Sequence, residues 1–387
     1  MSIKGKAYIA GAYEHPTRKA PDKSVYQLHA ECAKGALADA GLSLADVDGY
    51  FCAGDVPGLG AINMIDYLGL KVRHLDSTDT GGSAYLVHVS HAAQAIAMGH
   101  CRVALITLAG RPRSEGSSGT VVRNFGLTPD RPFEVPYGPV TVNMYAMAAA
   151  RHMHEHGTTR EQLAWIKVAA SHHAQHNPHA MLREVVTVDE VLASPAIADP
   201  LHRMDCCVVS DGGGALVVVH PDIARSLRRP LVKVLGAGER AKGQDGGRVD
   251  LTTTGAAWSG AAAFAEAGVK PADIQYASIY DSFTITVLLQ LEDLGFCKKG
   301  EGGRFVADGN LISGVGRLPF NTDGGGLCNN HPANRGGMTK VIEAVRQLRG
   351  EAHPAVQVPN CALALAQGTG GSIGTRHGSA TLIMERE

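Results

Sequence analysis

Two corners built on paired glycines give this chain two similar halves. Gly81-Gly82 and Gly336-Gly337 each come just before a long segment with apolar residues at helical spacing. Around both corners, short apolar runs alternate with further helical segments. Such alternation predicts strands joined by crossover helices in a parallel or mixed sheet. We therefore predict an α/β protein made of two similar units, with a weak internal duplication.

The strand-like runs indicate how deeply the sheet is buried. Residues 101–110, "CRVALITLAG", form a nearly continuous apolar run without the alternation of a half-exposed strand. Such runs are typical of a sheet that is covered on both faces. Further strands are predicted at 6–13, 230–239, 274–283 and in the tail 361–385, while 205–220 is predicted to form two strands around a turn.

The pattern changes between residues 111 and about 200. Residues 111–139 are loop-like, and helical runs follow at 140–157 and 159–177. Thr159 stands three residues before Gln162, the spacing of a capping box. We interpret 111–200 as an insertion into the first half. The predicted halves are residues 1–229 and 230–387.

Charge and cysteine content exclude several classes of protein. The formal net charge of the 387 residues is −1, so no basic surface for nucleic acid is expected. No stretch is long enough to span a bilayer, and the start lacks the apolar core of a signal peptide. The eight cysteines form no CxxC pair, which favours free thiols in a reducing cytoplasm.

Tyr280 and Asp281 form the first candidate site, where a predicted strand ends before a helix. A phenol in this position can give or take a proton if its pKa is lowered or if it lies beside a charge. The alternative is a half-buried aromatic residue that caps the core.

His331 is the second candidate, just ahead of a glycine corner. Pro332 holds its backbone extended. A histidine in this position can donate a hydrogen bond to a developing oxyanion or shuttle a proton. It can equally be a structural residue of a turn.

Other motifs give weaker signals. The pairs His152/His156 and His172/His176 have the spacing of a two-histidine metal face, but no third ligand lies at a telling distance, so no metal is expected. "GAGERAKG" lacks the spacing of a dinucleotide loop, and "GSSG" near residue 118 is not the nucleophile elbow of a hydrolase.

Cysteine nucleophiles need a base within reach. Cys328 lies three residues before His331 and is the only cysteine near a plausible base, whereas Cys52 and Cys361 are not. A buried, inert thiol is the alternative in each case.

Five segments together resemble the thiolase superfamily, and within it the non-specific lipid-transfer-protein-like or sterol-carrier-type branch. The resemblance runs in register over essentially the whole chain. The segments are "DSTDTGGSAYLVHVSHAAQAI", "CCVVSDGGGALVV", "YDSFTITVLLQLEDLGFCKKGEGGRFV", "NTDGGGLCNNHPANRGG" and "AQGTGGSIGTRHGSATLI".

The resemblance implies a duplicated βαβαβαββ fold with five α-β-α-β-α layers, and it assigns the site. The nucleophilic cysteine of the family falls on Thr78, and the second cysteine falls at about 367–368. Both thiolase cysteines are therefore missing. The family's His-Pro corner matches His331, and its other oxyanion-hole residue falls on Tyr280, followed by Asp281.

Loss of the thiolate decides the expected reaction, because thiolytic cleavage needs a strong nucleophile. Retro-aldol cleavage of a β-hydroxyacyl-CoA needs only a base, an acid and donors for the enolate oxygen. This reaction matches the steroid side-chain aldolases that the chain resembles. Tyr280 is expected to be the base or acid, and His331 with backbone N–H groups the oxyanion hole.

The corner residues keep a role in this scheme. Gly81 and Gly82 of the first corner, with Gly370 and Gly371 of the last glycine turn, are expected to contact the coenzyme A part of the substrate. No permanently bound cofactor is expected.

Two other functions stay open at this stage. The first is a thiolase-type acyltransferase, such as an acetyl-CoA acetyltransferase or 3-ketoacyl-CoA thiolase, with a substitute thiol. The second is a non-catalytic acyl-CoA carrier or scaffold subunit. The resemblance also implies a homodimer and a small OB-fold and zinc-ribbon partner protein.

Overall fold

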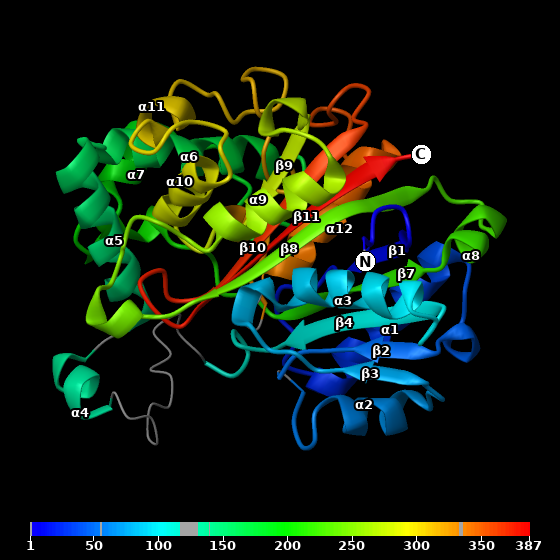
Figure 1. Cartoon of the computed structure of the whole chain (residues 1–387). Helices are drawn as coiled ribbons and strands as arrows, with labels where there is room; N and C mark the ends of the chain where they lie inside the picture. The colour runs from blue at the N-terminus through cyan, green and yellow to red at the C-terminus, as the bar shows by residue number, and fades with distance from the viewer. Residues whose placement is uncertain (1, 55, 117–130, 139, 333–335) are drawn as a thin grey trace.

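The structure is a computed structural model that describes the chain except for residues 1, 55, 117–130, 139 and 333–335. The "GSSG" stretch and part of the predicted loop 111–139 therefore fall outside the described residues. In Figure 1 the strands cross the middle of the molecule. Helices α5, α6, α7, α10 and α11 gather at one end of it, and α1 and α2 lie at the other.

The first half follows the predicted alternation of strands and helices, and α1 ends at Gly41, which adopts the left-handed conformation. Its elements are β1 (Tyr8–Glu14), α1 (Val25–Ala40), β2 (Gly49–Phe51), α2 (Ala61–Leu68), β3 (His74–Asp76), α3 (Ala84–Ala97), β4 (Val103–Gly110), β7 (Gly212–Val219) and α8 (Pro221–Ser226).

The second half repeats this order and ends in the predicted strand pair. Its elements are β8 (Val232–Lys242), α9 (Ala256–Ala267), β9 (Tyr276–Ile279), α10 (Thr284–Asp293), α11 (Gly302–Val306), a short π-helix (Gly325–Asn329), α12 (Gly337–Arg349), β10 (Leu363–Gly371) and β11 (His377–Arg386).

The strand order shows the duplication directly. The strands form one hydrogen-bonded sheet in the order β3-β2-β4-β7-β1-β8-β11-β10-β9. The halves meet where β1 and β8 pair antiparallel. Outward from this point, β7, β4 and β2 are matched by β11, β10 and β9. A single parallel bridge between Ala277 and Phe320 takes the place of the last strand, β3. The expected boundary near residue 229 stays a prediction.

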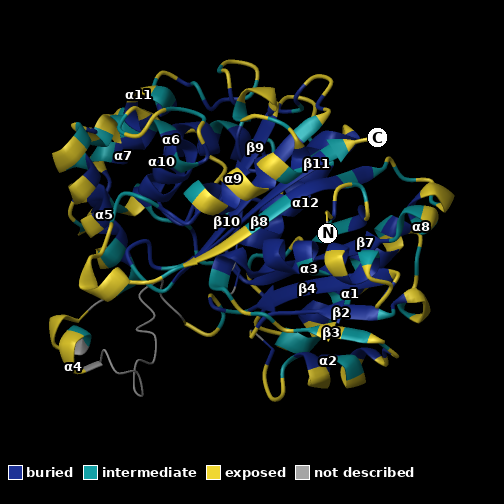
Figure 2. Cartoon of the chain, in the orientation of Figure 1, coloured by how far each residue is buried: buried dark blue, intermediate teal, exposed yellow. Residues whose placement is uncertain are grey.

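Strand side chains alternate between two separate regions of the core. In β4, Leu105 packs with the α1 side of the molecule, whereas Ile106 packs with α3 and α12. In the second half, Leu365 and Ile383 face α9 and α10, and their neighbour Leu382 faces α3 and α12. Both faces of the sheet are therefore covered, as the apolar runs predict, and Figure 2 shows its strands as mostly buried.

Helices α3 and α12 form the central layer of the molecule. Each contacts strands of both halves, while α1 covers the outer face of the first half and α9 that of the second. Because each half of the sheet packs against one side of the layer formed by α3 and α12, the order of layers is helix, half of the sheet, helix, other half of the sheet, helix. The expected five-layer α/β fold is confirmed.

The helices of the middle block pack onto the second half of the chain. Helices α5 (Thr141–His156) and α6 (Arg160–Ala174) contact α10. The predicted capping box of Thr159 and Gln162 is present. The short elements α4 (Arg131–Glu134), α7 (Val188–Ala193), β5 (Ala196–Ala198) and β6 (Leu201–His202) complete the block. The chain thus brings residues of the insertion over the C-terminal ends of β9 and β10.

One predicted strand is wrong. Residues 206–209, expected to be the first strand before the glycine turn, form no strand, and Cys206 makes only an isolated bridge with Phe283. The run is apolar because it lines a cavity. Among the described residues, no helix combines the length and the apolar character that crossing a bilayer requires.

The two glycine corners touch where α3 and α12 begin. A Cβ atom on Gly337 would lie 2.0 Å from the carbonyl oxygen of Gly82, and one on Gly370 would lie 1.9 Å from that of Thr80. These distances are far below van der Waals contact, so only glycine allows the backbones to approach this closely.

We expect Gly337→Ala to lower the free energy of unfolding by about 1–3 kcal/mol, the usual cost of overpacking. Without this contact, alanine would stabilise the start of a helix relative to glycine. The control is Gly243→Ala, because a Cβ atom on Gly243 would have no neighbouring atom within 4 Å. Urea denaturation of both variants measures the difference, and equal stabilities would contradict the close-contact explanation.

Candidate active site

A cavity of about 300 Å³ lies where the first corner, the middle block and the second half meet. Its wall is mainly apolar and aromatic, with one tyrosine–histidine pair. The lining residues are Gly82, Thr141, Val142, Tyr145, Ile197, Arg203, Cys206, Cys207, Val209, Tyr280, Ser282, Phe283, His331, Thr369, Gly370 and Gly371.

Tyr280 and His331 meet in this cavity. Tyr280 directly follows β9, and His331 follows the π-helix, 51 residues later in the chain. The Tyr280 Oη and His331 Nε2 atoms are 2.9 Å apart, and the rings pack edge to face with centroids 5.6 Å apart. The side chains are only 4% and 5% exposed. The structure therefore joins the two residues that the sequence singles out separately.

The first glycine corner makes room for the phenol. A Cβ atom on Gly82 would lie 2.4 Å from Tyr280 Oη and 2.3 Å from the carbonyl oxygen of Thr369. From the other side, the Gly336 N–H donates to Tyr280 Oη at 3.3 Å. The first corner thus leaves space for the phenol, and the second corner supplies a hydrogen-bond donor to its oxygen.

Burial keeps both groups of the pair neutral. Desolvation raises the pKa of Tyr280 well above its ordinary value, and the nearby Cys207 adds to the effect. A lowered pKa, which is one of the two conditions expected from the sequence for proton transfer by this phenol, is therefore not met, and the phenol does not rest as a phenolate. Desolvation also lowers the pKa of His331 to about 4, although the Asp281 carboxylate acts in the opposite direction. A neutral imidazole can accept a proton that a neutral phenol passes on.

Asp281 lies outside the cavity lining, although it is the next residue after Tyr280. Its buried carboxylate accepts the N–H groups of Gly326 at 2.8 Å and Leu327 at 3.1 Å. The Lys340 ammonium lies 2.7 Å from its Oδ1 atom. The geometry therefore gives Asp281 the task of holding the π-helix, and a direct catalytic role stays a prediction.

Thr78 also lies outside the lining. Its hydroxyl donates to Asp76 Oδ1 at 2.7 Å, and its N–H donates to the same atom at 2.8 Å. Asp76 is in turn bound at 2.6 Å by His91. Although burial opposes the effect, the hydrogen bonds to His91 and Thr78 lower the pKa of Asp76, so this carboxylate is too weak a base to activate the threonine hydroxyl.

Of the four glycines predicted to contact coenzyme A, three line the cavity and one does not. Gly82, Gly370 and Gly371 line the cavity, whereas Gly81 packs against Gly370 with a Cβ distance of 3.1 Å. Close backbone packing explains why these positions are glycine. Contact with coenzyme A stays a prediction for all four.

The aromatic wall of the cavity is not predicted from the sequence. Tyr145 of α5 and Phe283 pack with ring centroids 4.5 Å apart, and the Tyr145 hydroxyl donates to the Gly371 carbonyl oxygen at 3.2 Å. Both residues line the cavity. The apolar run "CCVV", which the pattern predicts to be a strand, is the sequence signal for part of the same wall.

The thiols near the site are poor nucleophiles. Cys328 is buried outside the lining, with its Sγ atom 3.1 Å from Lys167 Nζ. Cys206 and Cys207 do line the cavity, but desolvation raises the pKa of Cys206 to about 12 and that of Cys207 further. Desolvation also raises the pKa of Cys328, although the nearby Lys167 opposes this effect. Since the thiolate is the reactive form, none of the three thiols is activated.

The histidines of the two predicted pairs contact other side chains of the protein. His152 is fully buried and contacts Glu292 at 3.1 Å through Nε2 and Thr158 at 2.9 Å through Nδ1. His176 stacks on His353 with centroids 4.9 Å apart. In the part of the chain that the structure describes, no group of three or more potential ligands could hold a metal ion.

Comparison with known proteins gives relatives that cover about nine tenths of this chain. Residues 239–386 match the family described as thiolase C-terminal domain-like. A steroid side-chain-cleaving aldolase of Thermomonospora curvata is 36% identical, with 90% of this chain and 91% of the relative covered. The 17-hydroxy-3-oxo-4-pregnene-20-carboxyl-CoA lyase of Mycobacterium tuberculosis is 35% identical, with 90% and 92% covered.

Two further matches widen the comparison. An acetyl-CoA acetyltransferase of Methanothermobacter thermautotrophicus is 33% identical, with 92% of this chain and 93% of the relative covered. The solved structure described as an Ltp2-ChsH2(DUF35) aldolase matches with a TM-score of 0.88 and 33% identity over 99% of this chain and 98% of that chain.

We expect two histidines to titrate on opposite sides of neutrality. His331 should remain neutral down to about pH 4, whereas hydrogen bonds to Asp76 and Glu239 raise the pKa of His91 to about 9. NMR of histidine-labelled protein, assigned with His331→Gln and His91→Gln, measures both values. Because unfolded His331 would gain a proton near pH 6.5, it should also reduce stability as the pH falls from about 6.5 to 4. A His331 signal that titrates near 6.5 would disprove its desolvation.

Proposed function

The chain belongs to the thiolase superfamily, in its sterol-carrier-type branch, and from this premise we propose that it cleaves a β-hydroxyacyl-CoA by a retro-aldol reaction. The observation that carries the proposal is the Tyr280–His331 pair, buried in a cavity whose thiols are protonated. A proton-transfer pair without a thiolate suits aldol chemistry better than acyl transfer.

The reaction moves one proton from the β-hydroxyl of the substrate to its Cα atom, and it requires no proton from solvent. The β-hydroxyl of the substrate loses its proton, the Cα–Cβ bond breaks and a ketone or aldehyde forms at Cβ. The bond electrons form the enolate of the thioester. The same proton then reaches Cα and gives the shortened acyl-CoA. One group that accepts the proton and returns it is therefore sufficient.

The Tyr280–His331 pair can perform this transfer. With Nε2 of the neutral imidazole as acceptor, the phenol donates to His331 and offers an oxygen lone pair to the substrate hydroxyl. As that proton arrives, the proton of the phenol moves to Nε2. The resulting imidazolium is favoured by the negative charge of Asp281 and becomes a charged donor for the enolate oxygen.

The cavity supports an apolar acyl group next to the reacting carbons. Val142, Tyr145, Ile197 and Phe283 form an apolar and aromatic wall beside the pair. Two relatives carry names that refer to steroid or pregnene compounds. We propose that a bulky, largely apolar β-hydroxyacyl group occupies this wall, with coenzyme A as part of the substrate.

The acyltransferase function is the second candidate, because an acetyl-CoA acetyltransferase is among the relatives. It would need a thiol that reaches the thioester, and Cys206 and Cys207 are the described cysteines that line the cavity. Their raised pKa values weigh against this function. The carrier function leaves the buried Tyr280–His331 pair unexplained.

We also propose how the protein assembles. The similar solved structure contains an aldolase with a DUF35 protein, and we propose that this chain also works with a small partner of that kind. We further propose a homodimer through the edge strand β3, beside which α2 and the turn before it expose Leu59, Ile62 and Tyr67. The free cysteines favour a reducing cytoplasm.

We expect Tyr280→Phe to lower kcat about 100-fold or more, the usual range for loss of a general acid–base group, with little change in KM. The control is Tyr145→Phe, which removes a hydroxyl from the same cavity and should lower kcat less than about 10-fold. Ketone release from a panel of β-hydroxyacyl-CoA compounds, with and without the small partner, measures both. Full activity of Tyr280→Phe would rule out the proposed proton transfer.

We expect no stoichiometric covalent intermediate. After incubation with acetyl-CoA and with a longer acyl-CoA, intact mass spectrometry should find the unmodified chain, because the cavity thiols remain protonated. An acyl adduct that disappears in Cys206→Ser, Cys207→Ser or Cys328→Ser would instead establish the acyltransferase function. Tight acyl-CoA binding without any turnover, alone or with the partner, would support the carrier.

A further inference from the structure

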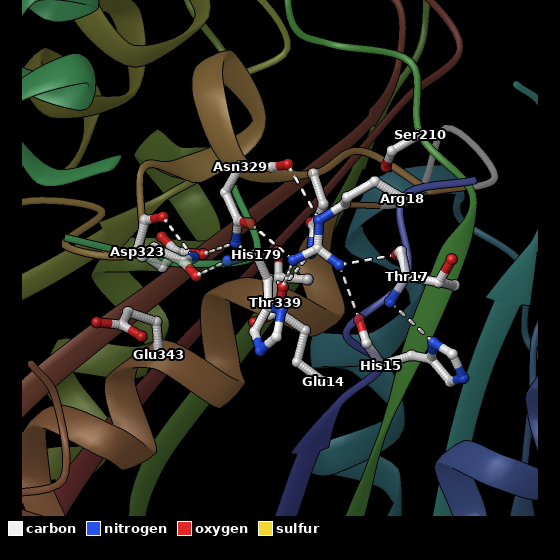
Figure 3. A network of polar contacts seen from close by, with 12 residues as sticks. Glu14, His15, Thr17, Arg18, His179, Ser210, Asp323, Asn329, Thr339 and Glu343 are labelled. Atoms are coloured by element: carbon white, nitrogen blue, oxygen red, sulfur yellow. Dashed lines mark hydrogen bonds and ion pairs between the residues drawn. The ribbon is translucent and has the colours of Figure 1, made fainter. Parts of the chain in front are cut away.

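A buried carboxylate lies behind the segment that carries His331. Glu14 stands at the end of β1, far from His331 in the sequence, and its side chain is only 5% exposed. Figure 3 shows it within a network of polar side chains beside Arg18 and Asn329. The network joins the first strand of the first half to the π-helix of the second.

Glu14 holds the two residues that precede His331. Its Oε1 atom accepts the side-chain amide of Asn329 at 3.1 Å, and it also accepts the side-chain amide of Asn330. The other Nδ2 contact of Asn329 is to Asp323, at 2.9 Å. One carboxylate oxygen therefore fixes two consecutive side chains immediately before the catalytic candidate.

Two arginines keep the carboxylate charged and in place. Arg18 Nη2 lies 2.5 Å from Glu14 Oε1, and Arg346 Nη1 lies 3.0 Å from Oε2. Burial alone would raise the pKa of Glu14, but these two positive charges outweigh it and lower the pKa. The carboxylate is thus available as a permanent acceptor.

Arg18 also binds the segment from its other side. Its Nη2 atom donates to Asn329 Oδ1 at 2.7 Å, and its Nε atom donates to the Asn329 carbonyl oxygen at 3.2 Å. Figure 3 shows Arg18 between Asn329 and the backbone of His15 and Thr17. The His331 N–H donates to Ser210 Oγ at 2.9 Å. The chain on the N-terminal side of His331 is therefore held at each successive residue.

We propose that Glu14 is a positioning residue for His331. Through Asn329 and Asn330, the carboxylate sets the direction in which the imidazole leaves the backbone, and so the distance between Nε2 and Tyr280 Oη. For its effect on turnover, this inference rests on the proposed retro-aldol function. Its effect on the geometry of His331 does not.

A purely stabilising role would be a poor reason for this arrangement. A buried ion pair contributes little net stability compared with apolar residues of similar volume, because its charges lose their hydration. Such a pair does fix the relative positions of its residues, because each N–H donor must point toward its acceptor. A misplacement of about 1 Å at a catalytic group can cost about 100-fold in rate, which is the scale of effect that the network would prevent.

Glu14→Gln tests the proposal. The amide keeps the size of the side chain but cannot accept hydrogen bonds from both arginines and both asparagines. We expect kcat to fall about 10- to 100-fold with KM changed less than about threefold, because a positioning residue acts on the reacting groups and not on substrate binding.

Asp39→Asn is the matched control. Like Glu14, which pairs with Arg346, Asp39 links β1 to α12. Its Oδ2 atom accepts hydrogen bonds from the N–H of Ala12 in β1 at 2.9 Å and from Arg349 of α12 at 2.8 Å. Its Oδ1 atom pairs with Arg229, so its polar partners among the described residues lie outside the segment 329–331. We expect similar loss of stability and an unchanged kcat. Equal losses of kcat in both variants would overturn the proposal in favour of a general structural role.

Asn330→Ala is a milder second variant, in case Glu14→Gln does not fold. It leaves the contacts of Glu14 with both arginines in place and removes one link to His331. We expect its kcat to fall in the same direction, and an unchanged kcat together with an unchanged His331 spectrum would overturn the proposal.

A histidine NMR titration separates this inference from the proposed function. If no β-hydroxyacyl-CoA is cleaved by the unaltered protein, the retro-aldol function fails, but the His331 signal can still be followed. We expect Glu14→Gln and Asn330→Ala to shift the His331 resonances and its pKa, and Asp39→Asn to leave them unchanged. An unchanged His331 signal in Glu14→Gln would overturn the positioning role whatever the activity.

Discussion

The close backbone contact between the starts of α3 and α12 determines where the site can form. Gly337 approaches the carbonyl oxygen of Gly82, and Gly82 leaves the space that the Tyr280 hydroxyl occupies. These helices form the central layer between the two halves, so a side chain at this contact would push their backbones apart. The packing of the two halves and the space for the Tyr280 hydroxyl thus both require glycine, which has no Cβ atom, at this contact.

Desolvation at this junction then sets the chemistry. The phenol of Tyr280 and the imidazole of His331 lie 2.9 Å apart with almost no exposure to solvent, and both are held neutral. The same desolvation keeps the thiols of Cys206 and Cys207 protonated. A cavity of this kind favours transfer of a proton between neutral groups and disfavours a thiolate, which accords with aldol cleavage and not with acyl transfer.

The sequence identified residue types better than it identified their orientation. Tyr280 and His331 stand out because each ends an element at a corner. The pattern places Asp281 beside them, but the next residue after a strand points to the opposite side, and its carboxylate holds the π-helix instead. Thr78 occupies the position of the lost nucleophile, and its hydroxyl is bound to Asp76.

The sequence by itself determined most of the order of strands and helices, the burial of both sheet faces and the duplication, because hydrophobic periodicity and glycine corners are local signals. The exception is the apolar run 206–209, which forms no strand. It could not indicate that the middle block would cover the second half, nor that Glu14 would hold the segment before His331. Those contacts join distant parts of the chain and depend on the packing of whole layers. Only the tertiary structure decides them, since no local pattern records which distant donor a buried carboxylate will meet.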